Sequence, residues 1–283
     1  MGGPDPKSKP IEAAMEKPIM RVRAVQPRPT PRPLSRRQAM APTDTVISMT
    51  LEASATIRVG HVQIPLETAI KWVRSYTDEV KNLSSAVPYA FPAYDRYNEL
   101  QADPARVSDA DLLAPALLNV GSSIRSFYGL QQIRGRLEDA LANKDLAKPL
   151  ASIEDKGRIA ALVKPLYAVL DDPKTRPWGL QVTTLSKILH RKRPQFLVLH
   201  DTWVKRCYFG AEKPVVPVTG RSPSDYMVAI TRAIGRDIRD QEDLFRKLDE
   251  SSNCPGELSH VRLIDILAWT SRGKPPVESD EPS

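Results

Sequence analysis

The sequence has little of what a disulfide scaffold, a metal cluster or a membrane span requires. Its 283 residues include two cysteines, Cys207 and Cys254, and neither belongs to a Cys-x-x-Cys pair. This usage excludes a disulfide framework and a four-cysteine metal site, and it is typical of a reduced, cytoplasmic protein. No apolar run approaches the roughly 20 residues that a membrane-spanning helix needs. The first residues lack the apolar core of a secretory signal. We expect no membrane partner, no metal and no cofactor.

Net positive charge is also small outside one segment. The formal net charge is +7, which alone would suggest an acidic partner such as nucleic acid. Residues 1–43 hold nine Lys or Arg and three Asp or Glu, so the rest of the chain has 32 basic and 31 acidic residues. The remainder is almost neutral. A nucleic-acid partner must therefore be argued from local clusters of basic residues.

Large apolar residues are sparse in residues 1–44, which contain nine of the 26 prolines. The stretch QPRPTPRPLSRR alternates proline with arginine. Such a segment buries too little surface to offset the entropy of ordering it, so we predict a disordered basic arm over residues 1–44. Two interpretations stay open. The arm is either a solvated tail or an added source of non-specific affinity for phosphates.

The rest of the chain has mainly helical periodicity. Alternating apolar and polar residues around Gly60-His61 predict a short β-hairpin over 55–66. Apolar residues then recur at spacings of three and four, and prolines and glycines interrupt the pattern. The fold class we predict is mostly α, in one domain over residues 45–271, followed by a tail over 272–283. The predicted helices cover 68–83, 108–117, 124–142, 156–170, 182–190, 201–209, 223–238, 241–248 and 258–269.

The most informative segment runs from RPWGLQVTTLSKIL into HRKRPQFLVLHDTWVKR. A glycine turn at Gly179 that opens into a helix presents free backbone N–H groups and a positive dipole end to an anion. Thr183 and Thr184 add hydroxyl donors. Six basic residues accompany one acid, which predicts a phosphate-binding surface: Lys187, Arg191, Lys192, Arg193, Lys205 and Arg206. The alternative is a solvated helix end whose bases favour the dipole.

Asp201 follows the apolar run Phe196 to Leu199 after a single intervening residue, His200. Its side chain can cap the next helix by accepting from the amides of Trp203 or Val204. It can also remain ionised in a pocket and stabilise developing positive charge. These two roles are compatible. His190 and His200 are interpreted as structural or surface histidines.

Four tryptophans, Trp72, Trp178, Trp203 and Trp269, are interpreted as packing residues. Trp178 has the best claim to stack on a nucleobase, because it adjoins the glycine turn. Asp265 lies among the apolar residues of the last predicted helix. There it is expected to cap or to pair internally.

This order resembles the helix-hairpin-helix DNA glycosylase superfamily, whose hairpin has roughly the sequence Leu-Pro-Gly-Val-Gly-x-Lys-Thr-Ala, with Pro-Val-Asp-Thr-His-Val about 20 residues later. Gly179 corresponds to the first family glycine, Thr184 to its threonine, and Asp201-Thr202-x-Val204 to Asp-Thr-x-Val. The resemblance implies a two-lobed fold that binds DNA, with RNA left open, through residues 179–193. It implies removal of a modified or damaged base, with Asp201 as the catalytic carboxylate.

Two departures from the family pattern qualify that expectation. Gln181 replaces the second glycine, which makes the same positive-φ turn harder to form. Thr183 stands where bifunctional members carry a lysine, so the resemblance implies a monofunctional enzyme. Lys187, one helical turn later on the same face, is a secondary catalytic candidate. The four trailing cysteines that hold an iron–sulfur cluster in some members are missing.

The chain also resembles a branch known only as a domain of unknown function, through KILHRKRPQFLVLHD and RLIDILAW, across roughly residues 55–271. This second resemblance names no activity. A catalytically silent nucleic-acid-binding or regulatory module of the same fold is therefore the alternative to an enzyme. A monomer is expected in either case.

Overall fold

The computed structural model describes residues 55–97, 103–121 and 123–276. The chain divides into two units, residues 1–42 and 43–283, and every described residue belongs to the second. The predicted basic arm and residues 277–283 of the predicted tail lie outside the described residues. Within the described ranges, no helix combines the length and the apolar character needed to cross a bilayer.

A short antiparallel hairpin opens the described chain, as predicted. Strands β1 (Thr56–Val59) and β2 (Val62–Pro65) pair with Val59 opposite Val62. Gly60 turns the chain with a φ of 62°, and a Cβ there would lie only 2.1 Å from the carbonyl oxygen of Cys207. Glycine is therefore required for both conformation and space. The amide of His61 donates to the same carbonyl at 2.9 Å, which fixes the hairpin on a later helix.

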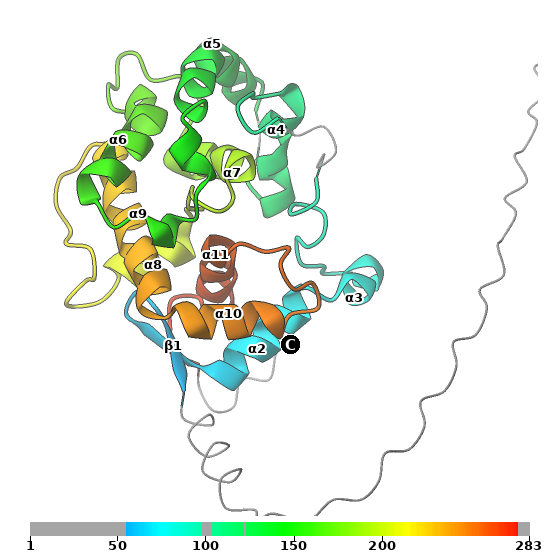
Figure 1. Cartoon of the computed structure of the whole chain (residues 1–283). Coiled ribbons are helices and arrows are strands. Elements are labelled where there is room, and N and C mark those ends of the chain that lie inside the picture. Colours follow the sequence, from blue (N-terminus) through cyan, green and yellow to red (C-terminus); the bar gives the residue numbers. More distant parts are fainter. Residues whose placement is uncertain (1–54, 98–102, 122, 277–283) are drawn as a thin grey trace, which may run out of the picture. The chain divides into compact units, whose positions relative to one another are not determined.

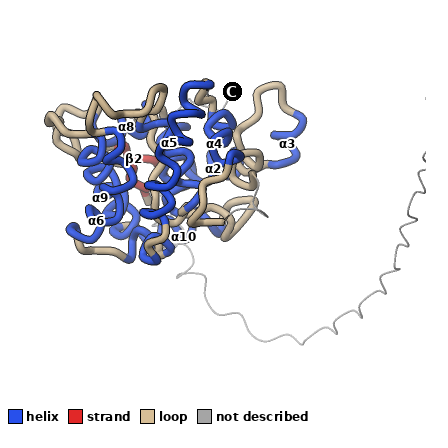
Figure 2. Tube along the Cα trace, turned by 90° about the horizontal axis from the view of Figure 1, so that it is seen from above, coloured by secondary structure: helices blue, strands red, loops and turns tan. Residues whose placement is uncertain are grey.

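Helices form almost all of the remaining regular structure, which confirms the mostly α prediction (Figures 1 and 2). The α-helices are α2 (Leu66–Tyr76), α3 (Glu79–Ser84), α4 (Asp109–Leu113), α5 (Ile124–Leu141), α6 (Lys156–Tyr167), α7 (Val182–Lys192), α8 (Thr202–Phe209), α9 (Pro223–Asp240), α10 (Glu242–Glu250) and α11 (His260–Ser271). Within the described residues, four short 3₁₀ turns accompany them: η2 (Ala114–Leu118), η3 (Lys144–Ala147), η4 (Leu150–Ser152) and η5 (Ala168–Leu170).

One predicted helix is wrong in its extent. The segment 68–83 is divided between α2 and α3, because the side chain of Asp78 accepts from the amide of Lys81 and begins a new helix. Val80 and Leu83 fall at apolar positions of the predicted helix over 68–83, but both are exposed on α3. An acid with a free side chain can start a helix in the middle of an apolar repeat.

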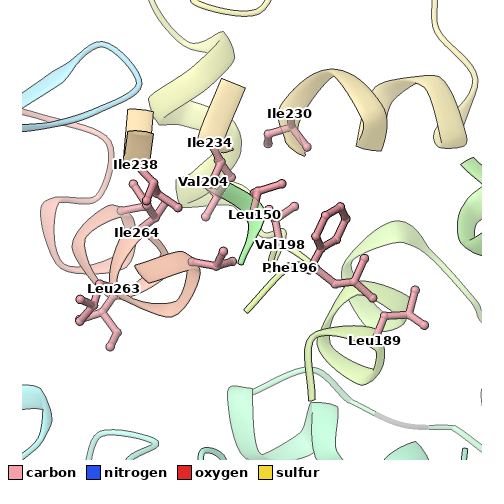
Figure 3. Packing of buried hydrophobic residues seen from close by; sticks show 14 of the residues in the cluster. Leu150, Leu189, Phe196, Val198, Val204, Ile230, Ile234, Ile238, Leu263 and Ile264 are labelled. Atoms are coloured by element: carbon pink, nitrogen blue, oxygen red, sulfur yellow. The ribbon is translucent and has the colours of Figure 1, made fainter. Parts of the chain in front are cut away.

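Helix α11 lies at the centre of the core. It packs against α2, α8, α9 and α10, and α9 packs along α6 (Figure 1). Figure 3 shows Ile234 and Ile238 of α9 facing Val204 of α8 and Ile264 of α11. The apolar run Phe196 to Leu199 is fully buried between α7 and α8. That burial places Asp201 at the start of α8, beside α11.

Candidate functional site

A pocket of about 330 Å³ lies where α7, α11 and the start of α8 converge. Tyr76 of α2, residues 88–90 and residues 118–120 complete its wall. Helices α2 and α11 thus form one wall, and α7 with the end of η2 forms another. Clefts between groups of helices are common places for ligand sites, and this volume falls at the lower end of the usual range of about 300–1,000 Å³.

Asp201 caps α8 and also lines the pocket. Its Oδ1 accepts from the amides of Trp203 at 2.8 Å and Val204 at 2.9 Å, so it caps α8. The residue also lines the pocket and is half-buried. Its Oδ2 makes no hydrogen bond with any described residue. The cap holds the carboxylate in place and leaves one oxygen available to the pocket.

Lys187 lines the same pocket. Its side chain comes from the middle of α7, and only 3% of the residue is exposed. Among the described residues, the side-chain nitrogen of Lys187 has no hydrogen-bond or ion-pair partner. Burial lowers the pKa of Lys187, while the carboxylates of Asp265 and Asp201 oppose that shift. An ammonium without a partner at this depth is costly, so the environment favours the neutral amine relative to an exposed lysine.

Arg262 and Asp265 form a buried charged network on α11. The guanidinium of Arg262 donates to both carboxylate oxygens of Asp95, at 2.7 and 3.1 Å, and to the hydroxyl of Tyr76 at 2.5 Å. It also pairs with Oδ2 of Asp265, whereas Oδ1 of Asp265 is buried without a partner. Burial raises the pKa of Asp265 to about 6, against the opposing charge of Arg262. Asp265 was expected to cap or to pair internally, and it pairs with Arg262. Its place in a pocket was not expected.

Aromatic rings supply much of the remaining wall. Tyr89 lies 5.3 Å from Tyr76 and 5.8 Å from Trp269, measured between ring centroids, and the second pair meets edge to face. Trp203 lines the pocket too, with the guanidinium of Arg206 over its ring at 4.6 Å. Trp203 and Trp269 were interpreted as packing residues, yet both border the pocket. A pocket with these walls suits a flat, partly polar ring.

The two histidines of this region are structural. Nδ1 of His190 lies 2.7 Å from the carbonyl oxygen of Leu197, and burial lowers its pKa to about 3. His200 lies between the hydroxyls of Thr183 at 3.3 Å and Tyr226 at 2.7 Å. Burial lowers the pKa of His200 to about 4. Both imidazoles are therefore neutral at pH 7, as expected of structural histidines.

The glycine turn forms as predicted. Gly179 has a φ of 76°, and a Cβ there would lie 3.0 Å from the amide nitrogen of Ser126, at the start of α5. Trp178 is 72% exposed, and the guanidinium of Arg125 stacks over its ring at 5.2 Å. Gln181 is exposed and precedes α7 without providing a side-chain cap.

The helices on either side of this turn have separate neighbours. Helix α6 packs on α9 and α5, while α7 packs on η2 and α4. Thr184 is buried and cannot offer its hydroxyl to a phosphate at the surface. Thr183 faces the pocket and His200.

The basic cluster of residues 191–193 is partly buried. Lys192 is buried in an ion pair with Asp111 at 2.9 Å. Arg191 donates to the carbonyl oxygen of Tyr94, and Arg193 donates to that of Leu141 at 2.7 Å, but both residues are half-exposed. These three side chains connect α7 to earlier parts of the chain. Lys192 cannot belong to a solvent-facing phosphate patch, because its charged group is buried, whereas phosphate contact by Arg191 and Arg193 stays a prediction.

The pocket lies within a recognised sequence family. The family of unknown function DUF6308 matches residues 69–272, a range that includes every residue that lines the pocket. No curated protein and no solved structure matches the chain. Because the match covers more than half of the sequence, the chain belongs to the DUF6308 family.

Proposed function

We propose that this protein binds nucleic acid, with DNA as the first candidate and RNA left open, and removes a modified or damaged base by hydrolysing its N-glycosidic bond. The observation that carries the proposal is the position of Asp201. The α8 cap fixes one of its carboxylate oxygens, and the other has no described partner beside an aromatic-walled pocket. A carboxylate used only as a cap has no need of such a pocket.

In this proposal the target nucleotide leaves its stack and its base enters the pocket. Aromatic rings such as Tyr89 and Trp269 contact the base, and the sugar lies near Asp201. As the bond breaks, positive charge develops on the sugar, and the fixed carboxylate stabilises it. Water adds to the sugar carbon and gives a proton to Asp201. The departing base takes a proton from the ammonium of Lys187, which lines the pocket and has no described side-chain partner.

Nucleic acid would contact the protein near the glycine turn. Trp178 presents an exposed ring, and Arg125 adds a positive charge beside it. Exposed aromatic rings with neighbouring arginines suit stacking on bases and attraction to phosphates. Lys192 has no part in this contact, since its charged group is buried in an ion pair, whereas the half-exposed Arg191 and Arg193 stay candidates for phosphate contact. A cytoplasmic location and a monomeric state remain parts of the proposal.

Release of free base from oligonucleotides tests the proposal. Duplexes and single strands that carry a panel of modified bases are incubated with the parent protein and with Asp201→Asn. Asparagine caps helices about as well as aspartate, so the variant should keep its stability. It should lose roughly 10²-fold or more in rate, because the charge is gone. Equal release by both proteins would remove Asp201 from the chemistry.

Borohydride trapping tests the monofunctional assignment separately. With Thr183 at the position of the family lysine, we expect no covalent adduct with DNA. An adduct that disappears in Lys187→Met would contradict the assignment and identify Lys187 as the nucleophile. Binding to the oligonucleotides without any release would instead support the silent module.

A further inference from the structure

Two buried charged groups in the pocket have unused hydrogen-bonding capacity. Only 3% of Lys187 is exposed, and its side-chain nitrogen has no partner among the described residues. Asp265 is 7% exposed, and its buried Oδ1 has no partner. Buried polar groups are nearly always hydrogen-bonded, since each unsatisfied group costs free energy. Both residues line the pocket. A ligand that supplies an acceptor for one and a donor for the other would remove the cost.

The positions of the two groups fit a single ligand edge. Lys187 and Asp265 line the same pocket. Their charged atoms lie more than 4.0 Å apart, because no ion pair joins them. Arg262 holds Oδ2 of Asp265 and so fixes the carboxylate. A fixed acceptor and a buried donor in one pocket can hydrogen-bond to a donor and an acceptor that stand next to each other on the ligand.

We propose that the pocket selects planar rings with a lactam edge, in which a carbonyl stands next to a ring N–H. Lys187 donates to the carbonyl, Asp265 accepts from the N–H, and the aromatic wall contacts the ring faces. This inference deepens the proposed function, because it names the substrate class: oxidised or deaminated bases that present such an edge. It also extends the proposed role of Lys187 in the reaction. The ammonium at the carbonyl stabilises the negative charge that develops on the departing lactam ring before it gives that ring a proton.

Binding of free alkylated rings tests the proposal without any cleavage. The probes are two isomer pairs, 1-ethyluracil with 1,3-dimethyluracil and 9-ethylhypoxanthine with 1,9-dimethylhypoxanthine. Within each pair, the first compound keeps the ring N–H of the lactam, and the second carries a methyl group there and has no ring N–H. The composition is the same. Calorimetric titration of the full chain should show, for at least one pair, that the lactam isomer binds at least about 10-fold more tightly.

Lys187→Met provides the matching change in the protein. Methionine has a similar length and removes an unpaired buried charge, so the variant should be as stable as the parent or more stable. Its affinity for the preferred lactam isomer should fall at least about 10-fold. Lys71→Met, on the exposed face of α2, is the control and should leave affinity unchanged.

Three results would overturn the inference: equal binding of both isomers in each pair, no binding of any probe at millimolar concentration, or unchanged lactam binding by Lys187→Met. These results are distinguishable from failure of the proposed function. Lactam rings that bind to a protein that releases no base from DNA would uphold the pocket's selectivity and reject the glycosylase. Base release from DNA, together with equal binding of both isomers in each probe pair, would uphold the glycosylase and reject the pocket's selectivity.

Discussion

Lys192 and Asp111 form an ion pair of 2.9 Å in which only 2% and 5% of the side chains are exposed. The pair joins the last turn of α7 to α4, and the same carboxylate accepts from the amide of Ser108 to cap α4. The lysine at the centre of the most basic cluster in the folded chain is therefore an internal connection. Removal of the lysine leaves the buried carboxylate of Asp111 without its neutralising charge.

Lys192→Met is accordingly expected to lower the free energy of unfolding by about 3–5 kcal/mol, since breaking a buried pair strands one charge. Urea denaturation followed by circular dichroism measures the change. Lys205→Met, an exposed replacement, should stay within about 0.5 kcal/mol of the parent. A loss in Lys192→Met no larger than in the control would mean that the pair is unimportant in solution.

Trp178→Ala should weaken binding to single-stranded DNA by about 1–3 kcal/mol, the usual contribution of a stacked base. Stability should hardly change, because the ring is mostly exposed. Fluorescence anisotropy at constant salt measures the affinity, and Val218→Ala, another exposed apolar residue, is the control. Equal affinities of the parent and Trp178→Ala would exclude this ring from the nucleic-acid contact.

Gly179→Ala should destabilise the protein by about 1–3 kcal/mol, because a side chain at positive φ is strained and also approaches Ser126. Gly135→Ala offers a comparison of opposite sign. Gly135 is an interior position of α5 with open space around it, so alanine there should stabilise the helix by roughly 0.5–1 kcal/mol. Thermal unfolding of both variants gives the comparison. Similar shifts for the two would contradict the tight packing of the turn on α5.

Acid should destabilise the fold partly through His190. Its pKa is lowered to about 3 by burial, so the folded protein excludes a proton that the unfolded chain binds below pH 6.5. Stability is therefore lost as pH falls from about 6.5. For this residue alone the loss is roughly 2 kcal/mol between pH 6.5 and 4.5. Asp265, with a pKa raised to about 6, acts in the opposite direction, because its contribution is lost as pH rises.

His190→Asn isolates the contribution of the histidine. The asparagine amide can keep the hydrogen bond to Leu197, which lies 2.7 Å from Nδ1 of His190, but cannot take up the proton. Urea midpoints measured from pH 7 to 4.5 should fall less steeply for this variant than for the parent. Parallel pH curves would show that another group causes the acid sensitivity.

Local patterns predicted much of this fold from the sequence. The capping box of Ser108 and Asp111, the turn at Gly179 and the cap at Asp201 each depend on residues within four positions of one another. Such short-range signals carry their own geometry. The division between α2 and α3 was missed because the apolar repeat continues across Asp78, and the cap was not given enough weight.

The long-range partners could not be predicted in the same way. Lys192 finds Asp111 across 81 positions, and Arg262 finds Asp95 across 167. Periodicity reports which face of a helix is apolar and says nothing about which distant carboxylate neutralises a given base. A charged residue on an otherwise apolar helix was the available signal. Arg262 and Asp265, within RLIDILAW, fit that description.

The hairpin at the start of the described chain bears on how the protein is made. His61 meets Cys207 across 146 positions, and the amide of Gly60 meets the carboxylate of Asp237 across 177. During synthesis the hairpin is translated 146 and 177 residues before these partners. Helix α11, which forms one wall of the pocket, follows all the other described helices. The apolar faces of α2 and the hairpin must wait uncovered until then, so a nascent chain that stalls before α11 is exposed to aggregation and is a natural client for chaperones.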